Sequence, residues 1–292
     1  MNAIPAYDPN ASYEVHYQDM VYRREGELAL PVRVYQRDGP FPALLDVHGG
    51  AWGAGDPLQN AESQSALAAS GLVVAAIDFR SSAMAPHPAA MEDISYAVRW
   101  LKAHAADFNA TSSGLGAVGW SSGGHQVMLG AMRPRLYATL PLPDAPDIDA
   151  NLAYAVLGWP VIDPAARHRL ALEGNLRSRE RGVSDFIERH YAYFGDEAGM
   201  EEANPQRILD RAELVELPPV LIIQGSADEQ LPRMMAERFV ESYSLAGGAI
   251  ELGKYPGSPH GFLREPGPNA DRGLTQIKSF IARRLSELRE SD

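Results

Sequence analysis

The stretch 115–125, which reads Leu-Gly-Ala-Val-Gly-Trp-Ser-Ser-Gly-Gly-His, most narrows the folds that this chain can adopt. A short apolar run ends in the pattern G-x-S-x-G at residues 119–123, and residues 126–132 can continue as a helix. In such a pattern a strand turns so sharply into a helix that the central serine is held in strained backbone geometry. The flanking positions are glycine because a Cβ there would collide with the strand and the helix. The stretch therefore predicts a strand, a tight turn at Ser121 and a helix.

The pattern alone is a weak signal. The chain contains 26 glycines, so a chance match is plausible, and an ordinary Gly/Ser turn between a strand and a helix would look the same. The pattern gains weight only if its chemical partners occur elsewhere in the chain.

Short, nearly continuous apolar runs recur along the chain, as expected of strands buried on both faces of a sheet. They are residues 43–47, 72–77, 115–120, 154–158, 219–224 and 249–255. Helical patterns alternate with them at 62–69, 89–106, 126–132, 231–245 and 275–288. This alternation predicts a parallel sheet with crossover helices. Residues 13–22 and 28–35, separated by a turn signal, predict an antiparallel pair ahead of it.

Two segments do not follow the alternation. Residues 164–206 are charged and lack a buried-strand pattern, which suggests a small helical cap over the sheet; an ordinary long surface excursion is the alternative. Residues 1–27 are also little constrained by the sheet. We expect one domain over 1–292, with 1–27 and about 164–206 as its cap segments.

Composition excludes several classes of function. The net charge of −12 argues against nucleic acid or an anionic membrane surface as a partner. The absence of cysteine removes disulfides, thiolate catalysis and cysteine-based metal sites. The first residues show no signal-peptide pattern, and no apolar run reaches the eighteen or so residues of a membrane helix. We expect a cytoplasmic protein without a membrane partner; its oligomeric state stays open, with a homodimer among the options.

Three candidate groups follow strands of the predicted sheet: Ser121, Asp228 after the run 219–224, and His260 after the run 249–255. Ligands of open parallel sheets bind beyond the carboxyl ends of the strands, where these groups are expected. A serine hydroxyl becomes a good nucleophile when an imidazole accepts its proton, and a carboxylate fixes the tautomer of that imidazole. The order Ser, Asp, His is that of an α/β-hydrolase triad.

Each assignment has an alternative. Asp228 could be a turn aspartate, and His260 could be one of the eight histidines with a structural role. Glu229 is the alternative acid. His125 is the alternative base, although its side chain would have to fold back from the helix that follows Ser121.

The motif at 48–52, His-Gly-Gly-Ala-Trp, makes the chain resemble the hormone-sensitive-lipase-like branch of the α/β-hydrolase superfamily. The segments 78–80, 159–163 and 259–262 also look like motifs of this branch. The resemblance spans residues 28–288 and implies a mostly parallel eight-stranded sheet flanked by helices, with a small helical cap. It implies that the amides of Gly50, Ala51 and Ser122 form an oxyanion hole, with Trp52 beside them in the substrate-binding region.

The resemblance further implies a serine carboxylesterase that cleaves small or aromatic esters through an acyl-enzyme, without a metal or an organic cofactor. The chain departs from the usual G-D-S-A-G-G and H-G-G-G-F patterns at Trp120, Ser122 and the pair 51–52. The form H-G-G-x-W is similar to arylformamidases and carbohydrate-active esterases of the same fold. A formamide or amide hydrolase, and a binding protein that has lost turnover, therefore remain alternatives.

Overall fold

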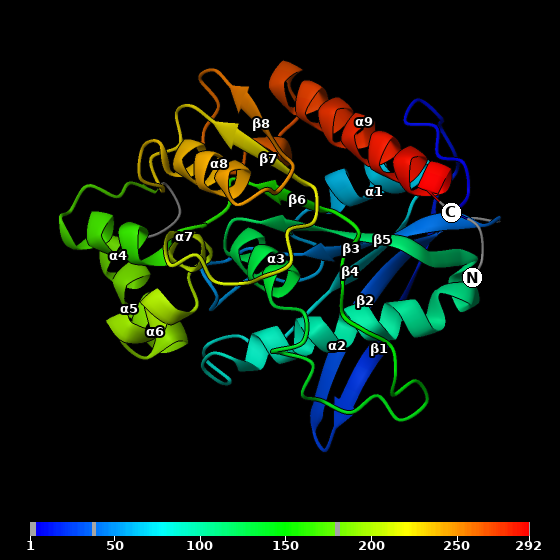
Figure 1. Ribbon diagram of the computed structural model, residues 1–292, viewed down its shortest axis with the longest axis horizontal. Helices are drawn as coiled ribbons and strands as arrows, with labels where there is room; N and C mark the ends of the chain where they lie inside the picture. Colours follow the sequence, from blue (N-terminus) through cyan, green and yellow to red (C-terminus); the bar gives the residue numbers. More distant parts are fainter. Residues whose placement is uncertain (1–3, 37–38, 179–181, 292) are drawn as a thin grey trace.

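An eight-stranded sheet runs through the centre of the chain, in the order β1-β2-β4-β3-β5-β6-β7-β8 (Figure 1). The computed structural model describes residues 4–36, 39–178 and 182–291. The strands are β1 (His16–Glu25), β2 (Leu28–Gln36), β3 (Phe41–Val47), β4 (Val73–Ile77), β5 (Ala110–Trp120), β6 (Ala155–Gly158), β7 (Val220–Gly225) and β8 (Ile250–Tyr255). Only β2 runs antiparallel to its neighbours β1 and β4. The mostly parallel eight-stranded sheet predicted from the resemblance is confirmed.

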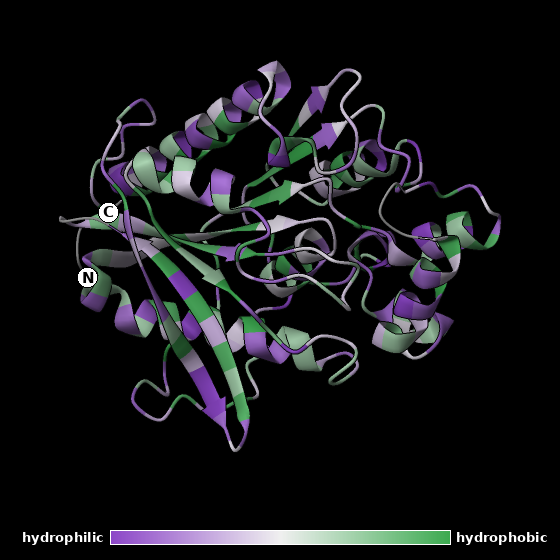
Figure 2. Ribbon diagram, turned by 180° about the vertical axis from the view of Figure 1, so that it is seen from behind, coloured by the Kyte–Doolittle hydropathy of each residue, from purple (hydrophilic) through white to green (hydrophobic). Residues whose placement is uncertain are grey.

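Burial explains why the central strands are apolar runs. All five residues of β4 are buried, and so are six of the seven in β3, because helices cover both faces of the sheet. The outer strands alternate instead: Figure 2 shows hydrophilic and hydrophobic bands along β1 and β2, the hairpin at the bottom of the view. One face of that hairpin is exposed to solvent.

Helices cover the two faces of the sheet. On one face lie α2 (Ala89–His104), α3 (Ser122–Met132) and α8 (Met235–Leu245); on the other lie α1 (Ala61–Ala69) and α9 (Pro268–Ser291) (Figure 1). Two short 3-10 helices, η1 (Ala105–Phe108) and η2 (Phe262–Arg264), complete these layers.

The strand order reverses at β3, which has β4 on one side and β5 on the other. The last residue of β3, Val47, pairs with Gly119 near the end of β5. The loop that begins at His48 and the turn at Ser121 therefore leave the sheet side by side. Such a reversal is where open α/β sheets bind their ligands.

Among the described residues between β6 and β7, four helices form what we call the helical insertion: α4 (Pro164–Leu172), α5 (Val183–Phe194), α6 (Glu197–Glu202) and α7 (Pro205–Asp210). Arg189 of α5 approaches the carbonyl oxygen of Gly50, with Nη1 at 3.4 Å. The backbone N–H of Arg177 donates to the carbonyl of Glu229 at 2.9 Å. The helical insertion thus lies over the loops at the carboxyl ends of β3 and β7, on the left of Figure 1.

Tyr7 and Tyr13, in the segment 1–27 that we expect to be part of the cap, lie away from the carboxyl ends of the strands. The Tyr7 hydroxyl lies 2.8 Å from the Ser70 hydroxyl, and the Tyr13 amide donates to the Ala69 carbonyl at 2.8 Å. Both contacts are at the amino end of β4. The rest of the segment is occupied by β1, because its alternating residues pair with β2 at the edge of the sheet.

Two glycines of α3 give a matched test of the turn at Ser121. A Cβ on Gly123 would lie 2.3 Å from the carbonyl oxygens of Val47 and His48, whereas a Cβ on Gly130 would meet only the Met91 methyl group at 3.5 Å. We expect Gly123→Ala to lower the free energy of unfolding by at least about 2 kcal/mol, because the backbone cannot yield. We expect Gly130→Ala to raise it by about 0.5–1 kcal/mol. Urea unfolding of both variants checks this, and similar effects at the two positions would contradict the close approach.

Candidate active site

Ser121 lies in the turn between β5 and α3 with φ of 54° and ψ of −116°. A non-glycine residue rarely adopts this conformation, and the surrounding hydrogen bonds must hold it. The Ser121 amide donates to the Gly158 carbonyl at 2.8 Å, and its carbonyl accepts from the Val161 amide at 3.1 Å. Gly119 is required because a Cβ there would lie 2.4 Å from the Gly123 carbonyl oxygen. The turn has the geometry that the sequence pattern predicts.

A chain of hydrogen bonds joins Ser121, His260 and Asp228, the three side chains expected at the strand ends. The Nε2 atom of His260 lies 2.9 Å from the Ser121 hydroxyl, and its Nδ1 atom lies 2.8 Å from the carboxylate of Asp228. With an ionised Asp228, Nδ1 carries the proton and Nε2 accepts the serine hydroxyl hydrogen. Ser121, His260 and Asp228 thus have the geometry needed to activate the hydroxyl.

The carboxylate of Asp228 is only 3% exposed yet held in its charged form. Burial alone would raise the pKa of this carboxyl, but the His260 imidazole and hydrogen bonds from the Gln230 amide and the Gln224 side chain lower it below its ordinary value. The two amide donors lie 2.9 and 3.0 Å from the carboxylate. The carboxylate is thereby oriented toward the imidazole before any substrate arrives.

The alternative acid and base lie elsewhere. Glu229 is exposed, and its backbone carbonyl, not its side chain, is held by the amide of Arg177. Both ring nitrogens of His125 are occupied, Nδ1 by the indole N–H of Trp52 at 3.2 Å and Nε2 by the Ala203 carbonyl at 2.7 Å. Burial lowers the pKa of His125 to about 3. His125 is therefore a neutral, bonded side chain in the interior, and it does not reach Ser121.

The loop after β3 approaches the turn at Ser121 closely. A Cβ on Gly49 would lie 2.8 Å from the Trp120 carbonyl oxygen and 3.1 Å from the Ser121 Cβ. Gly50 has φ of 120°, and a Cβ there would lie 1.9 Å from the carbonyl oxygen of Ala54. Only glycine fits these positions, so the two glycines of the H-G-G motif let the backbone lie against the serine.

His48 supports this loop instead of facing the serine. Its ring is stacked on Phe79 with the centroids 4.4 Å apart, and Nε2 lies 3.3 Å from the Asp78 carboxylate. Its Nδ1 lies 2.8 Å from the carbonyl oxygen of Gly49. Both ring nitrogens thus point to neighbours that orient the loop.

Three backbone amides next to the turn at Ser121, those of Gly50, Ala51 and Ser122, have no hydrogen-bond acceptor among the described residues. Ser122 is the first residue of α3, where amides have no intrahelical partner. Unpaired amides at a helix start favour negative charge.

Trp52, which the resemblance places in the substrate-binding region, is only 2% exposed. Its ring packs against His190, Tyr193 and Phe194 of α5, with centroids 4.9 to 5.4 Å apart. Trp120 and Trp159 are fully buried and pack on each other. The Trp52 ring thus joins α5 of the helical insertion to the loop after β3.

Trp120, which replaces the usual aspartate of the branch, has a partner of its own. Its indole N–H donates to the carboxylate of Asp46 at 2.7 Å, and the side chain of Gln64 donates to the same carboxylate at 2.9 Å. Burial raises the pKa of Asp46 to about 6 in spite of these two bonds. The hydrogen bond between Trp120 and Asp46 thus holds the residue before Ser121 to the neighbouring strand β3.

Two contributors to the site were not found from the sequence. Arg189 approaches the Gly50 carbonyl from 139 residues away, and both carboxylate oxygens of Asp185 hold its Nε at 2.9 Å. Gln224 supports Asp228 from the end of β7. The position of Gln224 at a strand end is a usable signal, whereas nothing local in the helical insertion indicates Arg189.

The burial of His190 lets us predict how the free energy of unfolding changes with pH. Burial lowers the pKa of His190 from 6.5 to about 3. Below pH 6.5, His190 therefore binds a proton in the unfolded chain but not in the folded chain. Its contribution to the free energy of unfolding is fully present above pH 6.5 and is lost as the pH falls toward 3. We expect His190→Phe to reduce this loss by about 1.4 kcal/mol per pH unit between pH 6.5 and 4. Urea unfolding at four pH values measures it, and parallel profiles of the two proteins would refute it.

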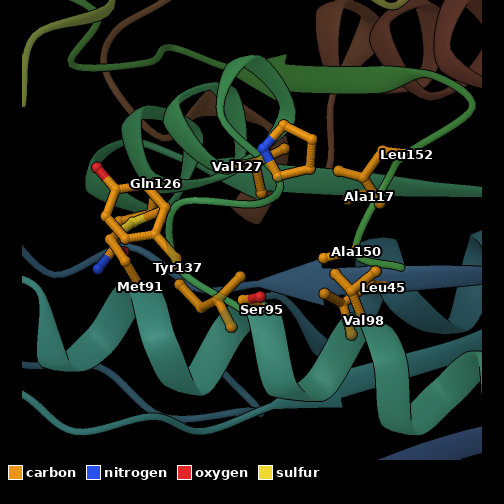
Figure 3. A pocket seen from close by; sticks show the side chains of 13 residues that line it. Leu45, Met91, Ser95, Val98, Ala117, Gln126, Val127, Tyr137, Ala150 and Leu152 are labelled. Atoms are coloured by element: carbon orange, nitrogen blue, oxygen red, sulfur yellow. The ribbon is translucent and has the colours of Figure 1, made fainter. Parts of the chain in front are cut away.

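A small cavity of about 20 Å³ lies between α2 and α3, with room for roughly one water molecule (Figure 3). Ser95, Gln126 and Tyr137 line it and each has a buried polar atom unpaired among the described residues. None of the three side chains of the hydrogen-bonded chain lines it. Over the ranges that the structure describes, no group of His, Asp and Glu side chains is arranged to hold a metal ion, and no helix is long and apolar enough to cross a membrane.

Comparison with known proteins places this chain in a family. The BD-FAE family model matches residues 32–243. Esterase LipC of Mycobacterium tuberculosis is 32% identical over 238 residues, which cover 76% of this chain and 53% of LipC. Carboxylesterase NlhH of the same organism is 26% identical over 286 residues, which cover 87% of this chain and 78% of NlhH. The chain thus spans about half the length of LipC and 78% of the length of NlhH.

Solved structures agree with these relatives. Esterase Est2 of Thermogutta terrifontis, with propionate bound, has a TM-score of 0.71 at 25% identity and covers 94% of this chain and 95% of its own. The same esterase phosphonylated by sarin has a TM-score of 0.73 at 25% identity, covering 94% and 96%. The chain belongs to the BD-FAE family, has the α/β-hydrolase fold and is similar to esterases of that fold.

Proposed function

We propose that this protein is a serine carboxylesterase, with residues 1–292 acting as one domain and the helical insertion as its cap. The observation that carries the proposal is the chain of hydrogen bonds from Ser121 through His260 to Asp228. Its relatives LipC and NlhH are an esterase and a carboxylesterase. Est2 is known with propionate bound and in a form phosphonylated by sarin.

In the proposed reaction, Ser121 Oγ attacks the ester carbonyl carbon while His260 Nε2 takes the hydroxyl proton. Asp228 holds the imidazole in the tautomer that accepts this proton and stabilises the imidazolium that forms. When the tetrahedral intermediate collapses, His260 donates the proton to the leaving alkoxide, which departs as an alcohol. Water, deprotonated by His260, then attacks the acyl-enzyme; the carboxylic acid is released as His260 returns the proton to Ser121 Oγ. These steps need no metal ion and no organic cofactor.

The amides of Gly50, Ala51 and Ser122 are proposed to bind the oxyanion of each tetrahedral intermediate. All three are unpaired with protein acceptors in the described structure, and the close approach of Gly49 to Ser121 brings them near the attacking oxygen. Preorganised donors of this kind stabilise the developing charge by about 3–4 kcal/mol each.

Turnover of p-nitrophenyl acetate tests the function directly. We expect hydrolysis that is abolished by preincubation with paraoxon. A formanilide substrate tests the alternative, since the same three side chains could cleave an amide: faster turnover of formanilide than of the ester would reassign the protein to formamide hydrolysis. Turnover of neither substrate, nor of other small esters, would favour a binding protein.

The size of the preferred acyl group is a separate prediction. Ser121 is only 5% exposed, and the helical insertion contacts the loops that follow β3 and β7, which favours an enclosed substrate pocket. We expect specificity to be highest for p-nitrophenyl esters of two to six carbons and to fall as the chain lengthens, because a long chain must displace packed side chains. A series from C2 to C16 measures this. A maximum at C12 or beyond would contradict an enclosed pocket.

A further inference from the structure

Trp52 is attached to the helix that begins after the nucleophile by two separate hydrogen bonds. Its backbone amide donates to the Ser122 hydroxyl at 3.2 Å. Its indole N–H donates to the Nδ1 atom of His125 at 3.2 Å. Ser122 and His125 are both on α3, three residues apart, so the bonds hold the main chain and the side chain of one loop residue to one rigid helix.

The helical insertion fixes the direction of this network. The Ala203 carbonyl, between α6 and α7, can only accept, so His125 Nε2 must be the protonated nitrogen of the ring. The other nitrogen of the buried, neutral His125 is then an acceptor, which is what the indole of Trp52 needs. With the proton on Nε2, each donor and acceptor in the series from the Trp52 indole through His125 to the Ala203 carbonyl has a hydrogen-bond partner.

The loop needs this support because its backbone is strained. Ala51 and Trp52 both have positive φ, at 52° and 61°, which is uncommon for single non-glycine residues and rarer for two in succession. Such conformations persist only where surrounding contacts determine them. The peptide that joins Ala51 to Trp52 is the one that the Ser122 hydroxyl holds, and the amide of Ala51 is the next donor along the chain.

We propose that Trp52, Ser122 and His125 are positioning residues that hold the amides of Gly50 and Ala51 at the oxyanion of the reaction. This inference rests on the proposed esterase function. It also gives one physical reason for three residues of the sequence. Hydrogen bonds connect Trp52, at the end of the H-G-G-A-W motif, to Ser122, directly after Ser121, and to His125. None of the three side chains touches the ester; they act through the loop.

The test compares Ser122→Ala and Trp52→Phe with the wild-type protein. Each change removes one of the two hydrogen bonds of Trp52 and leaves most of the side-chain volume in place. We expect each to lower kcat for p-nitrophenyl acetate about tenfold with KM changed less than twofold, because the amides act on the transition state more than on the bound ester. We expect the double variant to lose about a hundredfold.

A thiono ester separates positioning from general loosening of the structure. Sulfur accepts hydrogen bonds weakly, so an oxyanion hole accelerates an oxo ester far more than its thiono analogue. We expect the ratio of kcat/KM for p-nitrophenyl acetate to that for p-nitrophenyl thionoacetate to fall about tenfold in each variant. A purely structural role would lower both rates equally and leave the ratio unchanged.

Tyr243→Phe is the matched control. This buried side chain on α8 also loses one hydrogen bond, from its hydroxyl to the Pro218 carbonyl at 2.6 Å, and it lies outside the site. We expect a loss of stability with an unchanged ratio of oxo to thiono rates.

His125→Phe provides a second measurement that does not depend on Ser122. If Trp52 acts through His125, the variant Trp52→Phe/His125→Phe should lose no more activity than His125→Phe alone. An unchanged thiono ratio in the variants, with wild-type turnover intact, would overturn this inference alone. Absence of ester turnover in the wild-type protein would overturn the proposed function and the inference together.

Discussion

Replacing Ser121 with alanine is expected to lower kcat for p-nitrophenyl acetate by a factor of about 10³ or more while the protein remains folded. The hydroxyl is the only group that can form the acyl-enzyme in the proposed reaction, and residual turnover would come from the oxyanion donors and binding alone. Alanine adopts the φ of 54° at about the same cost as serine, so the turn should persist. Steady-state kinetics and thermal unfolding of the same preparation measure both expectations.

Ser112→Ala, at the amino end of the same strand β5, is the control for this substitution and should retain wild-type turnover. Covalent labelling gives an independent check, since paraoxon should add to Ser121 and to no other residue. Substantial turnover by the Ser121→Ala variant, or a mass shift on a different peptide, would show that the nucleophile is another residue.

Replacing Asp228 with asparagine is expected to lower kcat about 10³-fold. An amide N–H at this position would face His260 Nδ1, so the ring would adopt the other tautomer and present a proton to Ser121 instead of a lone pair. The Gln230 amide, which now donates to the other carboxylate oxygen, Oδ1, would still donate to the amide oxygen of the asparagine and keep it in place. The fold should therefore survive the loss of activity.

Glu229→Gln is the matched control for the acid, because it removes an adjacent carboxylate that is exposed. We expect its kcat to stay within about twofold of the wild-type value, as for other surface substitutions away from special features. An equal loss of kcat in the two variants, or a larger loss in Glu229→Gln, would contradict the assignment of Asp228 as the acid and favour Glu229.

The sequence predicted the central sheet well because each of those strands is specified locally. The runs 43–47, 72–77 and 219–224 are apolar throughout, and they form β3, β4 and β7 within two residues of the expected bounds. Element ends were less predictable. The helix expected from residue 231 begins at Met235, because Met234 has φ of 62° and interrupts it. The final helix begins at Pro268, seven residues before the expected start.

Residues outside the sheet were harder to place. The antiparallel pair expected from residues 13–22 and 28–35 forms as β1 and β2. The position of the residues before β1 was not indicated, since the contact of Tyr7 with Ser70 at the amino end of β4 joins residues that are 63 positions apart.

The sequence by itself determined the type of fold, the turn at Ser121 and the order in which Ser121, Asp228 and His260 reach the carboxyl ends of the strands. Buried strands and sharp turns are encoded by residues close together in the chain, and parallel pairing then brings their ends to one edge. Only the tertiary structure decided how the loop at Trp52 is held. The hydrogen bond between Trp52 and His125 joins residues 73 positions apart in the sequence, and the one between His125 and Ala203 joins residues 78 positions apart. Such contacts depend on where the helical insertion packs on the sheet, and no local periodicity specifies that packing.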